Sequence, residues 1–106
     1  MSCFVVIREA GLTWADGGIM AQPRVEDHAR FMGTLADEGF VLLAGPLAGT
    51  EHGRLRAMLV VNAADDHEIH GRLADDPWTD RLSVSSIEPW TILVGTRPGI
   101  QTVAIT

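Results

Sequence analysis

The longest regular pattern of apolar and polar positions runs from Val25 to Gly39 and predicts an amphipathic helix. At 100° per residue, the apolar side of this helix is formed by Val25, Ala29, Met32, Leu35 and Ala36. Pro23 suits the first turn of the helix, and Gly39 suits a left-handed stop. His28 lies inside the apolar stripe, where a leucine would stabilise a core more, so its presence needs an explanation.

Strand patterns precede and follow this helix. Runs rich in apolar and β-branched residues cover Ser2 to Arg8, Phe40 to Leu47 and Leu55 to Val61. The last two runs are separated by a turn rich in glycine and polar residues, which predicts an antiparallel hairpin. Between the first strand and the helix lies a long glycine-containing loop. Loops of this length are uncommon in small domains and are often functional.

The second half of the chain predicts one more helix and one more strand. Asn62 suits the cap of a shorter helix within residues 63–75, which Pro77 stops. Even-numbered positions from Leu82 to Val94 keep strand parity and predict one long, bent strand, in which Trp90 is interpreted as a core residue.

The predicted order is therefore β-α-β-β-α-β, an α+β domain with an antiparallel sheet and two helices on one face. The strands are apolar on both parities, so the other face of the sheet also needs cover. We expect a homodimer that closes sheet against sheet. The tail, residues 96–106, is expected either to add a short edge strand or to pack on the partner subunit.

Composition narrows the class of protein. The length suits a single domain over residues 1–106, with the 46% apolar and 21% charged residues of a soluble globular protein. The apolar runs are far shorter than a membrane span, so no membrane association is expected. The net charge is −6 and the basic residues are scattered, which argues against nucleic acid as a partner. No positively charged leader is visible, and we expect a cytoplasmic protein.

His28 and Asp76 are the strongest candidates for acid–base chemistry. A buried imidazole needs a polar partner, and Asp76 precedes Pro77, which biases it to an extended conformation that aims its carboxylate away from the second helix. If the two side chains meet, the carboxylate fixes the imidazole tautomer and supports its charged form. The alternatives remain open: a core histidine bonded to a backbone carbonyl, and an Asp-Pro pair that only ends a helix.

Other groups of residues give weaker indications of a functional site. His67 and His70 are three positions apart on a predicted helix but have no third ligand at a diagnostic spacing, so we expect an acidic, solvated helix face and no metal. The glycine-containing turns match neither a phosphate loop nor a dinucleotide fingerprint, and no cofactor is expected. The indoles of Trp14 and Trp78 are candidates for the walls of a pocket.

Three segments together resemble the YciI-like, or YCII-related, family over nearly the whole chain. They are DHARFMGTLADEGFVLLAGPL (Asp27 to Leu47), GRLADDPW (Gly71 to Trp78) and SIEPWTIL (Ser86 to Leu93). The resemblance implies a ferredoxin-like α+β fold, assembly as a dimeric α/β barrel, and a histidine–aspartate active-site pair that falls on His28 and Asp76. The family includes a chlorinated-hydroquinone dehydrochlorinase, and similar dimeric barrels include muconolactone isomerases. After DPW the chain departs from the commoner family pattern, because it lacks a glycine often found there.

The sequence therefore predicts a homodimer with a cleft in each subunit that binds a small molecule. His28 acts as general base or acid and Asp76 orients it, in proton abstraction from a small cyclic or phenolic molecule, as in a lyase or isomerase. The expected walls of the cleft come from Trp14, Gly45, Pro46 and Trp78. The alternative is a non-catalytic dimeric domain that binds a small ligand or modulates a partner protein, because this architecture hosts many functions.

Overall fold

The structure is a computed structural model that describes residues 2–95. It contains β1 (Ser2–Ala10), the 3-10 helix η1 (Ile19–Ala21), α1 (Val25–Asp37), β2 (Val41–Pro46), β3 (Arg56–Ala63), α2 (Asp66–Leu73) and β4 (Leu82–Pro89). The predicted order of strands and helices is confirmed. The prediction for the tail, residues 96–106, falls outside the described residues.

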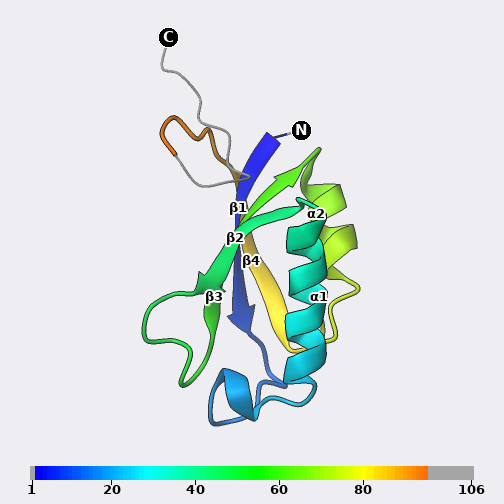
Figure 1. The fold of residues 1–106 in the computed structure, drawn as a ribbon. Helices are drawn as coiled ribbons and strands as arrows, with labels where there is room; N and C mark the ends of the chain where they lie inside the picture. The colour runs from blue at the N-terminus through cyan, green and yellow to red at the C-terminus, as the bar shows by residue number, and fades with distance from the viewer. Residues whose placement is uncertain (1, 96–106) are drawn as a thin grey trace.

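The strands form one antiparallel sheet in the order β2-β3-β1-β4. Both helices pack on the same side of this sheet (Figure 1). This arrangement is the ferredoxin-like α+β fold, with the two β-α-β halves interleaved. It confirms the predicted fold class and places the two chain segments that follow the helices, β2 and β4, at opposite edges of the sheet.

The core lies between the sheet and the helices. Alternate residues of a strand face the same side, and on β1 the residues under the helices are Phe4, Val6 and Arg8. Phe4 and Val6 pack with apolar residues of α1, α2 and β3. Arg8 is 2% exposed, and a charge buried to this extent needs a partner of opposite charge.

The ends of α1 agree in part with prediction. Gly39 follows the helix with a φ of 79°, the left-handed stop that the sequence predicts. Pro23, however, lies outside the first turn, because the helix begins after Arg24, whose φ is 61°. The carbonyl of Pro23 instead accepts a hydrogen bond from the indole nitrogen of Trp78 (2.7 Å).

The cap predicted for the second helix is wrong. Asn62 belongs to β3, where it pairs with Cys3 across the sheet. The cap is Asp65, whose side chain accepts a hydrogen bond from the backbone of Glu68 (2.9 Å). Pairing with β1 extends β3 beyond its most apolar segment and delays the start of the helix.

The prediction of one long last strand is also wrong, because β4 ends at Pro89. Arg8 pairs with Val84, but Val6 pairs with Ile87, so β4 carries one extra residue at this point. Such a bulge reverses which parity faces the core. Trp90, predicted as a core residue from its even position, is 45% exposed beyond the end of the strand.

The long loop before α1 is held firmly against the turn between β2 and β3. The backbone N–H of Ile19 donates to the carbonyl of Glu51 (3.0 Å), and Gly18 lies so close that a Cβ there would be 2.4 Å from the same oxygen. The buried side chain of Gln22 bridges back to the backbone of Ala15 and Gly18. These contacts fix Ile19 at the edge of the cavity described below.

Within residues 2–95, no helix combines the length and apolar character that crossing a membrane requires.

Candidate active site

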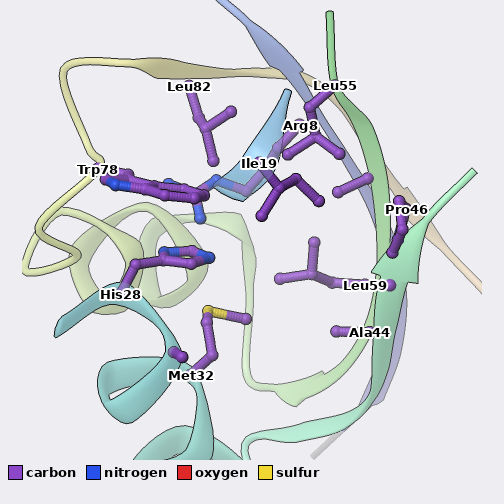
Figure 2. A pocket seen from close by; sticks show the side chains of 13 residues that line it. Arg8, Ile19, His28, Met32, Ala44, Pro46, Leu55, Leu59, Trp78 and Leu82 are labelled. Atoms are coloured by element: carbon purple, nitrogen blue, oxygen red, sulfur yellow. The ribbon is translucent and has the colours of Figure 1, made fainter. Parts of the chain in front are cut away.

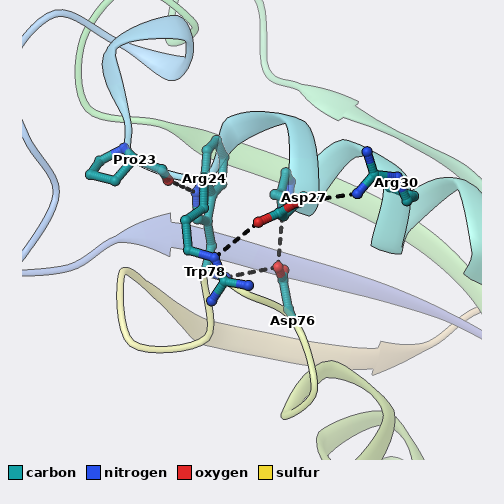
Figure 3. A network of polar contacts seen from close by, with 7 residues as sticks. Pro23, Arg24, Asp27, Arg30, Asp76 and Trp78 are labelled. Carbon is teal, nitrogen blue, oxygen red and sulfur yellow. Dashed lines mark hydrogen bonds and ion pairs between the residues drawn. The ribbon is translucent and has the colours of Figure 1, made fainter.

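Asp76 is the centre of a buried polar cluster. It lies in the turn after α2, and its side chain has no exposed surface. Its Oδ1 accepts hydrogen bonds from Nδ1 of His28 (2.8 Å) and from the backbone N–H of Trp78 (2.9 Å), while its Oδ2 accepts one from Nη1 of Arg8 (2.6 Å). Figure 3 shows Asp76 facing the first turns of α1. The cluster thus joins β1, α1 and the segment between α2 and β4.

The surroundings of Asp76 keep its carboxyl group ionised. Burial by itself raises the pKa of this group. The hydrogen bonds from His28, from the backbone of Trp78 and from Arg8, together with the charge of Arg8, more than offset burial and hold the pKa of Asp76 below its ordinary value. Asp76 is therefore a carboxylate at neutral pH and a permanent acceptor for its three partners.

The contact with Asp76 explains why a histidine lies in the apolar stripe of α1. A carboxylate only accepts hydrogen bonds, so Nδ1 of His28 carries the proton between them. The imidazole also stacks on the indole of Trp78, with ring centroids 3.9 Å apart and planes 9° from parallel. Within residues 2–95 no group hydrogen-bonds to Nε2, and the ring points toward the cavity (Figure 2).

Trp78 holds the imidazole in place from behind. It is 1% exposed, and its indole nitrogen donates to the carbonyl of Pro23 just before α1 (Figure 3). Trp14 packs edge-on against it, with centroids 5.3 Å apart and planes at 85°. Two constraints on the same indole leave His28 little freedom to turn.

An open cavity of about 260 Å³ lies between α1 and the sheet, with His28 at one end (Figure 2). Most of its wall is apolar. Residues that define it include Ile19 of η1, Met32 of α1, Ala44 and Pro46 of β2, and Leu59 of β3. An imidazole with one free nitrogen is thus placed against an apolar space large enough for a small molecule.

The structure brings most of the predicted site residues together. His28, Gly45, Pro46 and Trp78 line the cavity, and Asp76 lies behind His28. Trp14 is not part of the lining: it is buried behind Trp78, and its indole nitrogen donates to the carbonyl of Gly53 (2.9 Å).

Sequence reasoning missed Arg8, which borders the cavity and pairs with Asp76. A signal was present, because Arg8 shares the inward parity of Phe4 and Val6 on its strand. A cation at an inward position of a core strand indicates a buried acidic partner. The sequence alone does not show that this acidic partner is Asp76.

His67 and His70 lie on α2, and both are exposed. Across residues 2–95 no three histidine, cysteine or acidic side chains are grouped closely enough to hold a metal ion.

The fold and the site define a ferredoxin-like α+β domain with a histidine–aspartate pair beside a cavity. A solved structure with this fold is the 5-chloro-2-hydroxyhydroquinone dehydrochlorinase TftG from Burkholderia phenoliruptrix AC1100, in complex with 2,5-dihydroxybenzoquinone. The TM-score is 0.58 and the identity 20%, over 85% of this chain and 94% of that one. At this identity the likeness establishes the fold. No family model and no curated protein sequence matches the chain, so membership of the YciI-like family stays a prediction.

Proposed function

We propose that this protein is an acid–base enzyme of the lyase or isomerase type that acts on a small cyclic or phenolic molecule. The observation that carries the proposal is that the two ring nitrogens of His28 have different surroundings. Its Nδ1 is bound to Asp76, and its Nε2 has no hydrogen bond among the described residues and belongs to a ring that lines an apolar cavity.

The geometry supports a simple proton-transfer cycle. In the first step, Nε2 of His28 takes a proton from a C–H or O–H group of the ligand, and the electron pair of that bond stays on the ligand. Asp76 stabilises the imidazolium that forms, because it already accepts the Nδ1 proton. In the second step the proton returns to a different ligand atom, which gives an isomer, or it assists the departure of a leaving group, which gives an elimination.

The size and surroundings of the cavity support a small ligand with a ring. Ligand pockets commonly have volumes of about 300–1,000 Å³, and this one, at about 260 Å³, lies just below that range. Met32, Pro46 and Leu59 offer flat or flexible apolar surfaces on which a ring can pack. TftG, the structural neighbour, is a dehydrochlorinase in complex with a benzoquinone, which supports this class of ligand by analogy of fold.

We also propose that the protein is a homodimer that pairs through the sheet face opposite the helices. On that face Val5 lies opposite Val60 and Ile7 opposite Met58, and neither helix covers it. Val5, Ile7 and Met58 remain partly exposed there, whereas Val60 is already buried within the subunit. In a dimer with a twofold axis, both subunits contribute the same patch to the interface. Apolar side chains on this face would then pack against the same side chains of the second copy. The resemblance to the YciI-like family implies the same assembly, and a cytoplasmic location remains the expectation from sequence.

Solvent deuterium exchange tests the proposed chemistry without knowledge of the full reaction. Small phenols, lactones and ring carboxylic acids would first be screened for thermal stabilisation of the protein. Each binder would then be incubated with the protein in deuterated buffer and followed by proton NMR. We expect a ring proton of at least one binder to exchange in the presence of the protein, and the exchange to be lost in His28→Gln and strongly reduced in Asp76→Asn.

His67→Gln is the matched control, because His67 is an exposed histidine on α2, away from the cavity. It should leave the exchange rate unchanged. Binding without any exchange or turnover would favour the alternative, a non-catalytic ligand-binding domain, over the enzyme proposed here.

A further inference from the structure

Arg8 has more hydrogen-bond donors than its contact with Asp76 uses. A guanidinium carries five N–H groups, and only Nη1 reaches Asp76. Nε is buried and has no partner, and Nη2 makes no hydrogen bond to any group within residues 2–95. Because the side chain is 3% exposed, water has little access to these donors. A buried donor without an acceptor destabilises a fold, so it needs an explanation, and a functional role or a bound group is one such explanation.

Arg8 and His28 line the same cavity. Arg8 extends from β1 toward the rings of Trp78 and His28, which line the same cavity (Figure 2). The remaining walls are mostly apolar. An ionised oxygen in this space would therefore meet Arg8 and His28 as its polar neighbours, in surroundings that screen charge weakly.

The charges of the cluster favour a negatively charged ligand during catalysis. Asp76 balances Arg8 while His28 is neutral. Once Nε2 of His28 has taken a proton, the three side chains together carry one positive charge, which an anion in the cavity would compensate. Because only Nη1 faces Asp76, an anion at the other edge of Arg8 is kept apart from the carboxylate.

We propose that Arg8 recognises the ligand, and that the ligand is a small apolar ring bearing an oxyanion, either a carboxylate or a phenolate. Its charged oxygen accepts from the unpaired edge of Arg8, its ring packs on the apolar walls, and its reacting group meets Nε2 of His28. This inference rests on the proposed function for the placement of the ligand, and it adds the charge and the group that the site selects.

Benzoate and benzamide provide the test, because they have nearly the same shape and differ in charge. Calorimetric titration should show that the protein binds benzoate at least about tenfold more tightly than benzamide, as a charge-assisted hydrogen bond provides. Arg8→Gln should abolish the preference. Arg8→Lys keeps a cation beside Asp76 but loses the guanidinium edge, so it should keep the fold and lose most of the preference.

Arg30→Gln is the matched control, since Arg30 is an exposed arginine on α1 whose side chain forms an ion pair with Asp27 and does not line the cavity. It should leave the preference unchanged. Circular dichroism would establish that each variant is folded. Should Arg8→Gln fail to fold, Arg8→Lys carries the test.

Arg8 also borders a second cavity, of about 310 Å³, where His70 and Thr79 are neighbours. Ala44→Phe, which narrows the first cavity only, separates the two sites. Loss of benzoate binding in this variant supports the proposal. The proposal is overturned if Ala44→Phe binds benzoate normally, if the two compounds bind equally or not at all, or if the preference survives in Arg8→Gln and Arg8→Lys. A benzoate preference without deuterium exchange would refute the proposed enzyme and leave anion recognition standing.

Discussion

Arg8 and Asp76, 68 positions apart in the chain, form a buried ion pair in which Nη1 lies 2.6 Å from Oδ2. This pair fixes one oxygen of the carboxylate and leaves the other for His28. The orientation of the His28 imidazole therefore depends indirectly on Arg8 of β1, because both side chains bind the same carboxylate.

Replacing Asp76 with asparagine removes the charge that Arg8 and His28 share. We expect Asp76→Asn to lower the free energy of unfolding at pH 7 by about 3–5 kcal/mol, as when one partner of a buried ion pair is lost. Urea unfolding followed by circular dichroism measures this change. Asp75→Asn, at the exposed neighbouring carboxylate, should have almost no effect.

The stability of the protein should depend on pH through Asp76. Its pKa in the folded protein is lowered, so its stabilising contribution is complete above the unfolded-chain value of about 3.9 and is lost as pH falls through the lower folded value. Urea unfolding from pH 7 down to acid should show this loss in the parent and a flatter profile in Asp76→Asn. Equal acid sensitivity in both proteins would contradict the assignment.

Trp78 should contribute to stability through both its ring and its indole N–H. Trp78→Phe keeps a ring against His28 but leaves the carbonyl of Pro23 without its donor, for which we expect a loss of about 1 kcal/mol. Trp78→Ala also empties the space between His28 and Trp14 and should lose about 3–5 kcal/mol. Trp90→Ala is the control, because Trp90 is 45% exposed.

Gly18 should be intolerant of a side chain. An alanine Cβ would lie 2.4 Å from the carbonyl oxygen of Glu51, and the φ of 83° is unfavourable for any residue but glycine. We expect Gly18→Ala to lower the free energy of unfolding by about 1–3 kcal/mol and to weaken ligand binding through movement of Ile19. In contrast, Gly33→Ala in α1 has open space and should stabilise by up to about 1 kcal/mol. Thermal melting compares the two variants.

Narrowing the cavity should block ligands without loss of stability. Ala44 lines the cavity from β2 and is exposed, so the ring of Ala44→Phe should occupy the opening between β2 and α1. We expect affinity for any ligand of the site to fall at least about tenfold, with little change in melting temperature. Leu43→Phe, on the opposite face of the same strand, should bind ligand normally. Unchanged binding in Ala44→Phe would mean that the ligand lies elsewhere.

A charge on the uncovered sheet face should separate the proposed dimer. Ile7 lies opposite Met58 on that face, and Ile7→Glu would bring two carboxylates into the interface of a symmetric pair. Light scattering coupled to size-exclusion chromatography should give a dimer for the parent and a monomer for the variant. Leu12→Glu, at a fully exposed loop position, should remain dimeric. A monomeric parent would refute the proposed assembly.

The order of elements was predictable because it depends on short-range patterns. A stripe that repeats every three to four positions, alternating strand residues and glycine at turns act over a few residues each. The stop at Gly39 and the hairpin of β2 and β3 are confirmed for this reason. The wrong predictions arose where pairing between distant strands decided the outcome: β1 extends β3 past Asn62, and the bulge opposite Arg8 turns Trp90 away from the core.

By itself, the sequence determined that a histidine would lie on the buried side of α1 and that an aspartate would end the turn after α2. Only the tertiary structure decided that these side chains meet, that Arg8 completes the cluster, and that Trp14 lies behind the wall and not in it. The physical reason is distance along the chain. The two polar contacts join residues 48 and 68 positions apart, and their geometry depends on strand order, on register and on the path of the loop after α2.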